Sequence, residues 1–345
     1  MNVTDFADYR LTMRAGVHPA RPPRTPHEPE KGTPMTTTMI ADDILTPGPP
    51  RVEEVSDGIY AYIQPDGTWW INNAGFLVGE RGVVSVDTCS TVRRTRAYLD
   101  AIRSVTDQPV RMVVNTHHHG DHTFGNFLFE QATIVAHEDI RANIAMLGGP
   151  RSAPFWTDVD WGDVRLEPPF LTYRDGVTVW VDDLRCEVRH VGAVAHTNND
   201  SIVWVPDRKV LFAGDLLFNG GTPFVMQGSV AGLIHVLTDV IAPLGAETIV
   251  PGHGPVTGPD LIDTTVGYLR FVQRTARDGL AAGLSPLEAA RQVDLGEFAE
   301  LKDSERLVAN LRRAYAEEEG GQMDVLAALQ DMVTFNGGKP LTTHA

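Results

Sequence analysis

Short apolar runs separated by turn residues fill the chain from about residue 51 to residue 250. Runs of about 4–8 residues rich in Val, Ile and aromatic side chains are typical of β-strands. This pattern predicts strands at residues 59–63, 74–78, 82–87, 110–115, 133–135, 177–181, 186–190, 201–205, 210–212 and 248–250. The strands fall into two groups with helical patterns between and after them. This order favours an α/β protein with two sheets covered by helices.

Helical periodicity marks the remaining regions. Residues 91–105 carry apolar side chains at roughly helical spacing, and residues 233–241 are also predicted to form a helix. Residues 261–333 are mostly helical in pattern, and Ser285-Pro286-Leu287-Glu288 has the spacing of a capping box. We therefore expect a core at residues 49–260 and a helical region at residues 261–345 that packs on it.

The first 48 residues differ in composition from the rest. They contain many prolines and few large apolar side chains, so they can bury too little surface to fold. We expect residues 1–48 to be a disordered tail.

Composition and charge narrow the function classes. Of the 345 residues, 42% are apolar and 21% charged, and the formal net charge is -16. So acidic a chain is a poor partner for nucleic acid or for an anionic membrane surface. Two cysteines, Cys89 and Cys186, cannot form a disulfide framework. No apolar stretch approaches the ~20 residues that a membrane span needs, and no secretory signal is visible. We expect a cytoplasmic protein with neither nucleic acid nor membrane as a partner.

The densest chemical signal is Thr116-His117-His118-His119-Gly120-Asp121-His122, which directly follows an apolar strand. Imidazole and carboxylate are ligands for zinc, and also for iron or manganese. His117 and His119 are two residues apart and point the same way in an extended loop. Asp121 and His122 can then turn toward a neighbouring position. One loop can therefore contribute ligands to two metal ions.

Three further segments carry a metal-type side chain close to a predicted strand. They supply His196, Asp215 and His253. Each alone is a weak signal, because a single histidine or aspartate at a strand end is usually structural. Together with the first loop they give seven candidate donors at one edge, where strand ends converge.

In its order, His117-x-His119-x-Asp121-His122 followed by His196, Asp215 and His253, this set resembles the metallo-β-lactamase superfamily, in particular its glyoxalase-II-like binuclear hydrolases. The resemblance implies an αββα sandwich of two mixed β-sheets flanked by helices, here with a C-terminal helical extension. It implies two metal ions, for which the donor set favours zinc and leaves iron and manganese open.

The resemblance also implies a role for each residue. His117, His119 and His196 would hold one metal ion, Asp121, His122 and His253 the other, and Asp215 would bridge them. Asp87 would support the ligands without binding metal, and His118 would point away from the centre. Two metal ions lower the pKa of a shared water, and Asp121 would be the catalytic residue that orients the resulting hydroxide toward a carbonyl group.

Other stretches resemble a narrower group, the actinorhodin-type aromatic polyketide cyclases. They are residues 69–75, 221–224, 228–232, 268–274 and 307–311. This resemblance implies a cyclase and thioesterase that acts on a polyketide bound to an acyl carrier protein. It would catalyse second-ring aldol cyclisation and dehydration, then hydrolyse the thioester to release a bicyclic product. Trp69, Trp156 and Phe224 are the expected substrate contacts.

Two alternatives stay open. The first is a generic binuclear hydrolase of small thioesters or lactones, similar to glyoxalase II. Glu317-Glu318-Glu319 and the single tight basic pair Arg312-Arg313 in the helical region make glutathione a poor fit. The second is a catalytically silent metal-binding scaffold, which a missing ligand would favour. None of the seven is missing.

Overall fold

The computed structural model describes residues 48–345 except residues 65, 148 and 151–154, so the tail predicted at residues 1–48 lies almost wholly outside the described residues. The strands are β1 (Arg51–Ser56), β2 (Ile59–Ile63), β3 (Ala74–Gly79), β4 (Gly82–Val86), β5 (Val110–Val114), β6 (Thr133–His137), β7 (Leu171–Tyr173), β8 (Gly176–Val181), β9 (Leu184–His190), β10 (Ser201–Val205), β11 (Val210–Phe218) and β12 (Thr248–His253). The helices are α1 (Val92–Val105), α2 (Gly120–Thr123), α3 (Glu138–Leu147), α4 (Val230–His235), α5 (Asp260–Ala281), α6 (Pro286–Gln292), α7 (Arg306–Glu319) and α8 (Val325–Phe335). Short turns of 3-10 helix lie at Asn126–Leu128, Pro206–Arg208, Ala242–Leu244 and Gly296–Phe298, and Val236–Ile241 is π-helical.

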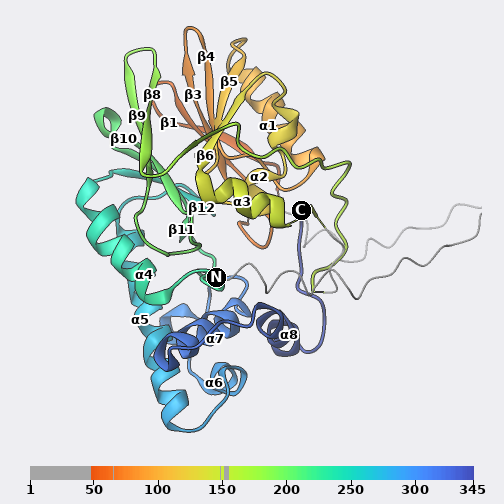
Figure 1. Ribbon diagram of the computed structural model, residues 1–345, viewed down its shortest axis with the longest axis vertical. Coiled ribbons are helices and arrows are strands. Elements are labelled where there is room, and N and C mark those ends of the chain that lie inside the picture. The colour runs from red at the N-terminus through yellow and green to blue at the C-terminus, as the bar shows by residue number, and fades with distance from the viewer. Residues whose placement is uncertain (1–47, 65, 148, 151–154) are drawn as a thin grey trace, which may run out of the picture. The chain divides into compact units, whose positions relative to one another are not determined.

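The strands form two mixed sheets, as the sequence predicts (Figure 1). The larger has seven strands in the order β1 to β7, antiparallel from β1 to β4 and parallel from β4 to β7. The smaller has five strands in the order β12-β11-β10-β9-β8, in which only β11 and β12 are parallel.

Alternation along the strands divides the apolar side chains among layers. In β10, Val203 and Val205 join a cluster that contains residues of both sheets, while Ile202 and Trp204 join the cluster under the C-terminal helices. Successive strand residues face opposite sides, so each sheet has one face toward the other sheet and one toward helices. The result is the predicted αββα sandwich.

Helices cover both outer faces (Figure 1). Tyr98 and Ile102 of α1 pack against Phe76 of the seven-stranded sheet. On the other side, α4, α5 and α7 contribute to one large cluster with the five-stranded sheet. That cluster continues into α6 and α8, so the C-terminal helices share a core with the five-stranded sheet. Among the described residues, no helix combines the length and apolar character that a membrane span requires.

Several elements differ from the sequence prediction. The sequence does not predict the strands β1 and β7 and the helix α3. The two strands lie at the edges of their sheet, where β1 has no buried side chain and β7 has one, and α3 has a weak apolar stripe. The strand at 210–212 continues to Phe218, and the helix expected at 233–241 begins at Val230 and is π-helical from Val236. The continuation of β11 could not be predicted because it runs through Ala213-Gly214-Asp215. Glycine and aspartate are depleted in strands and normally indicate a strand end.

Gly75 lies where the two sheets meet. A Cβ atom there would lie 2.2 Å from Cε1 of Phe212 and 2.8 Å from the carbonyl oxygen of Tyr60. We expect Gly75→Ala to lower the free energy of unfolding by about 1–3 kcal/mol through overpacking, measured by chemical denaturation. The matched control is Gly267→Ala in α5, where the nearest atom is 4.0 Å away. Because alanine favours helix, this control should be neutral or stabilising by up to about 1 kcal/mol. An equal loss in both variants would contradict the packing argument.

Candidate metal centre

The structure brings all seven predicted ligands together at one edge of the two sheets. His117 and His119 follow β5, Asp121 and His122 belong to α2, and His196 lies in the connection between β9 and β10. Asp215 lies within β11, and His253 ends β12. Their candidate ligand atoms form two groups, and within each group the atoms lie within 4.8 Å of one another.

The first group contains three imidazoles and one carboxylate. Nδ1 of His119 lies 3.1 Å from Nε2 of His117 and 2.9 Å from Nε2 of His196. Oδ2 of Asp215 lies 3.7 Å from Nε2 of His117 and 3.4 Å from Nε2 of His196. Three ring nitrogens and a carboxylate oxygen that converge in this way can serve as the donor set of a divalent metal ion.

The second group contains Asp121, His122 and His253. Oδ2 of Asp121 lies 3.4 Å from Nε2 of His253 and 3.9 Å from Nε2 of His122. Asp215 also reaches this group, since its Oδ1 lies 3.0 Å from Nε2 of His122 and its Oδ2 lies 3.4 Å from Nε2 of His253. Asp215 therefore stands between the two groups, the position that a bridging ligand requires.

The outer nitrogens of these imidazoles show that the residues fit a metal ion. Nδ1 of His196 is 2.5 Å from the carbonyl oxygen of Phe224, so this nitrogen must carry the proton and Nε2 is left with a lone pair. Nδ1 of His122 is held in the same way, 2.8 Å from Oδ2 of Asp87. The inner Nε2 of His122 and Oδ1 of Asp215 are buried and have no aligned hydrogen bond. Either a proton or a cation must stand between these two atoms.

The charges of the centre favour a cation at that point. Burial opposes charge on all its histidines and lowers the pKa of His196 to about 3. Burial also disfavours the charged form of His122 and His253, but Asp215 and the neighbouring carboxylates raise the pKa of His122 well above its usual value and the pKa of His253 to about 9. The carboxylates therefore demand positive charge, which bound divalent ions supply.

Asp87 holds the ligand loop in place. Its carboxylate accepts hydrogen bonds from the backbone N–H of Thr116 (2.7 Å) and the hydroxyl of Thr116 (2.8 Å) as well as contacting His122. Asp87 has a φ of 60°, a left-handed conformation that is rare outside glycine and is often found at functional sites. Asp87 thus contacts both the loop backbone and His122, while its supporting role stays a prediction.

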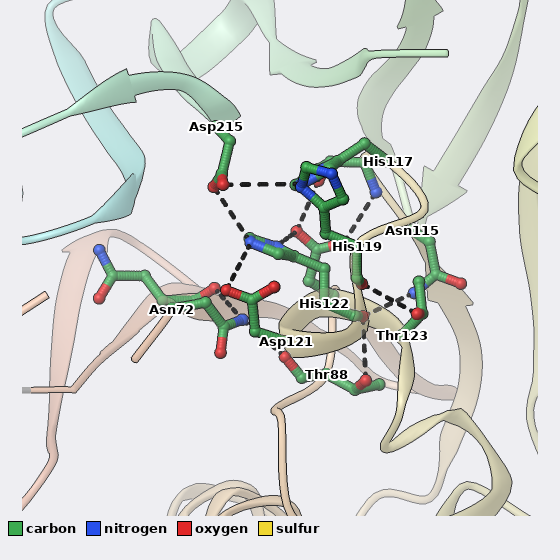
Figure 2. A network of polar contacts seen from close by, with 12 residues as sticks. Asn72, Thr88, Asn115, His117, His119, Asp121, His122, Thr123 and Asp215 are labelled. Atoms are coloured by element: carbon green, nitrogen blue, oxygen red, sulfur yellow. Dashed lines mark hydrogen bonds and ion pairs between the residues drawn. The ribbon is translucent and has the colours of Figure 1, made fainter. Parts of the chain in front are cut away.

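The backbone of the loop is fixed from below (Figure 2). The carbonyl oxygen of His122 accepts hydrogen bonds from the hydroxyl of Thr88 and the amide of Asn115, both at 3.0 Å. Asn72 in turn donates to the carbonyl oxygen of Thr88 at 2.7 Å. Sequence reasoning missed Asn72, Thr88 and Asn115, since single polar residues carry no signal until the fold places them under the loop.

His118 and Cys89 lie outside both groups. The ring of His118 contacts the side chain of Asn199, 3.0 Å away, rather than the ligands. Cys89 is fully buried, and burial raises the pKa of its thiol to about 12. A thiol held neutral in this way is a packing residue, as the sequence suggests.

An aromatic cavity opens onto the ligands. Its volume is about 280 Å³, and four of the seven ligands line it, namely His119, Asp121, Asp215 and His253. The three predicted contacts Trp69, Trp156 and Phe224 line it as well. Trp70, Trp161 and Phe218 line it too, beyond the three residues chosen as contacts. The sequence carries no signal for four further apolar lining residues, which are Phe124, Met226, Val325 and Leu329.

Comparisons with known proteins agree with this geometry. The family model described as "Metallo-beta-lactamase superfamily" matches residues 67–253, more than half of the chain. A solved metallo-beta-lactamase from Pontibacter korlensis aligns with a TM-score of 0.54 and 20% identity, covering 64% of this chain and 99% of that one. At this identity the likeness concerns the fold alone.

The matches to curated relatives cover only part of each relative's own length. A linear primary-alkylsulfatase from Pseudomonas sp. (strain ATCC 19151) is 26% identical over 62% of this chain, and the match spans only about half of that protein, 48%. The 2,4-dinitroanisole O-demethylase subunit alpha from Nocardioides sp. (strain JS1661) is 26% identical over 73% of this chain and 67% of its own length. The acyl-coenzyme A thioesterase MBLAC2 from Bos taurus is 23% identical over 54% of this chain and 78% of its own length.

We expect Asp87→Asn to lower metal affinity about 10- to 100-fold, the usual effect of losing a carboxylate that orients a ligating histidine. The change removes the negative partner of His122 and keeps the shape of the side chain. Competition with a chromogenic chelator measures the affinity, and circular dichroism checks that the variant folds. The control is Asp183→Asn, an exposed aspartate in the turn between β8 and β9. Wild-type affinity in a folded Asp87→Asn protein would refute the supporting role.

Proposed function

The chain belongs to the metallo-β-lactamase superfamily, and we propose that it is a metal-dependent hydrolase that cleaves the thioester of a flat, largely apolar acyl group. The finer form of the proposal is the reaction expected from the sequence. A polyketide bound to an acyl carrier protein would undergo second-ring aldol cyclisation and dehydration, and the thioester would then be hydrolysed to release a bicyclic acid.

One observation carries the proposal. The ligand groups open into a cavity with seven Trp and Phe side chains among the 22 residues of its lining. Trp69 meets Phe224 edge to face with ring centroids 5.0 Å apart, and Trp70 meets Trp156 in the same way at 5.6 Å. A pocket with apolar walls and a few polar groups at one end fits a ligand with an apolar body and one reactive polar group. Flat rings gain most from such walls, because aromatic faces and edges pack well together.

Each part of the pocket has a task in hydrolysis. Metal ions bound by the two groups would supply water activation and would stabilise negative charge on the carbonyl oxygen. The carboxylate of Asp121 lines the cavity and can accept a hydrogen bond from the attacking water. The aromatic walls hold the acyl body and exclude bulk water. The water oxygen bonds to the carbonyl carbon, the carbon–sulfur bond breaks, and the thiol leaves with a proton.

The names of two relatives support the two parts of the proposed substrate, the thioester and the flat ring. One is an acyl-coenzyme A thioesterase, and another has a flat aromatic molecule, 2,4-dinitroanisole, in its name. Zinc stays the proposed metal, two ions per chain, because histidine with carboxylate suits it.

Sulfate ester cleavage is the competing activity, since one relative is an alkylsulfatase. A sulfate ester carries a negative charge, which a side-chain cation would help to bind beside the metal centre. Apart from the histidines of that centre, Arg306 is the only basic side chain among the lining residues that the structure describes, and it is buried and paired with Asp303 at 2.7 Å. A thioester, which is uncharged at its reactive group, therefore fits the described lining better.

The test measures thiol release from the N-acetylcysteamine thioesters of 2-naphthoic acid and of acetic acid. We expect wild-type enzyme to prefer the naphthoyl thioester in kcat/KM. We expect a chelator or Asp121→Asn to lower the rate at least about 100-fold, because the water loses its activation. Metal added back after chelation should restore the rate.

A third substrate, an aryl sulfate, tests the competing sulfatase activity. Sulfate release without thiol release would refute the thioesterase. Faster turnover of the acetyl thioester would leave only the generic hydrolase of small thioesters or lactones. The mass of the product from a longer carrier-bound polyketide shows whether ring closure precedes release.

A further inference from the structure

Residues 341–344 run alongside the segment at 155–157, which forms part of the aromatic wall. The backbone N–H of Leu341 donates to the carbonyl oxygen of Phe155 at 2.7 Å, and the N–H of Thr157 donates to the carbonyl oxygen of Leu341 at 2.9 Å. Together they form a parallel bridge between Trp156 and Leu341. In Figure 1 the chain after α8 returns in dark blue toward the end marked C.

The same four residues also contact Trp69, which lines the pocket, and Arg94, which lies outside its lining. The hydroxyl of Thr343 donates to the backbone carbonyl oxygen of Trp69 at 3.0 Å, and the N–H of Thr343 donates to the hydroxyl of Thr157 at 3.0 Å. Arg94 of α1 donates to the carbonyl oxygen of His344 at 2.5 Å. Leu341 itself is fully buried in the cluster of the five-stranded sheet.

The wall depends on these contacts. In the described part of the chain, the backbone hydrogen bonds of residues 155–157 all run to Leu341. Trp156 packs edge to face on Trp69 at 5.8 Å between ring centroids, and both rings line the cavity. Residues 341–344 therefore hold, through the backbone, the two rings that face each other beside the metal ligands.

We propose that residues 341–344 form a strap that determines substrate specificity by positioning Trp69 and Trp156. The substrate for which the strap would select, a flat acyl group, rests on the proposed function. The strap lies outside residues 67–253, which match the family model, and none of its hydrogen bonds goes to a metal ligand. It is a feature of this chain's own pocket rather than of the metal centre.

Two neighbouring threonines provide a matched pair of variants. Thr343→Ala removes the hydroxyl that holds Trp69, while Thr342→Ala removes the same group from an exposed position. For Thr343→Ala we expect KM for the naphthoyl thioester to rise about 3- to 10-fold, the range for one lost hydrogen bond, with kcat within about twofold. For the acetyl thioester both constants should stay at wild-type values. Thr342→Ala should match the wild type throughout.

A binding measurement separates this proposal from the proposed function. Titration with 2-naphthoate, followed by tryptophan fluorescence, needs no turnover. We expect its Kd to rise about 3- to 10-fold in Thr343→Ala and to stay unchanged in Thr342→Ala. If wild-type enzyme hydrolyses no thioester, the proposed function fails, and the naphthoate titration still decides on the strap.

Three outcomes would overturn the strap. They are no binding of naphthoate to the wild type, equal Kd values in the two threonine variants, or an equal loss of kcat on both thioesters in Thr343→Ala. Chemical denaturation of the two variants shows whether a weaker Kd comes from a loss of global stability. In that case a variant ending at Pro340, assayed at a temperature where it is folded, must still show the KM effect on the naphthoyl thioester alone.

Discussion

Negative charge buried at the strand ends is the constraint on which the rest of the structure depends. Asp87, Asp121 and Asp215 are each less than 8% exposed and lie in one cluster. Carboxylates at this depth are stable only with compensating positive charge and a full set of hydrogen bonds. The αββα arrangement meets that demand, because it brings the ends of β4, β5 and β12 and the middle of β11 together, where histidines from three segments surround the carboxylates.

The ligands could be predicted from the sequence, since each is a chemically distinctive residue next to an apolar strand. His196 lies in the connection between β9 and β10 and His253 ends β12, and their order after the motif that begins at His117 joins them to it through the family resemblance. The wall of the cavity could not be predicted to the same depth. Phe124, Met226 and Leu329 are apolar side chains like any core residue, and only the tertiary arrangement decides that they face a cavity. The edge strands β1 and β7 could not be predicted for a different reason, since they bury too few side chains to leave an apolar pattern in the sequence.

The C-terminal helices do more than cover the five-stranded sheet. Arg306 at the start of α7 lies 4.3 Å above the ring of Trp69 and is also close to Phe218. Burial raises the pKa of its partner Asp303 to about 6, although the guanidinium of Arg306 opposes this shift. A buried cation that lies over aromatic rings holds those rings in position through cation–π attraction. The chemistry of the centre thus comes from the part of the chain shared with the family, and the floor of the cavity comes partly from outside it.

The contact between residues 341–344 and residues 155–157 also orders events during synthesis. The last of the seven candidate ligands, His253, leaves the ribosome nearly ninety residues before Leu341 does. At about 5–20 residues per second, this separation amounts to several seconds. Within that interval all seven candidate ligands are outside the ribosome, while residues 155–157 still lack the backbone with which they pair. The aromatic wall is therefore the part of the pocket that the chain completes last.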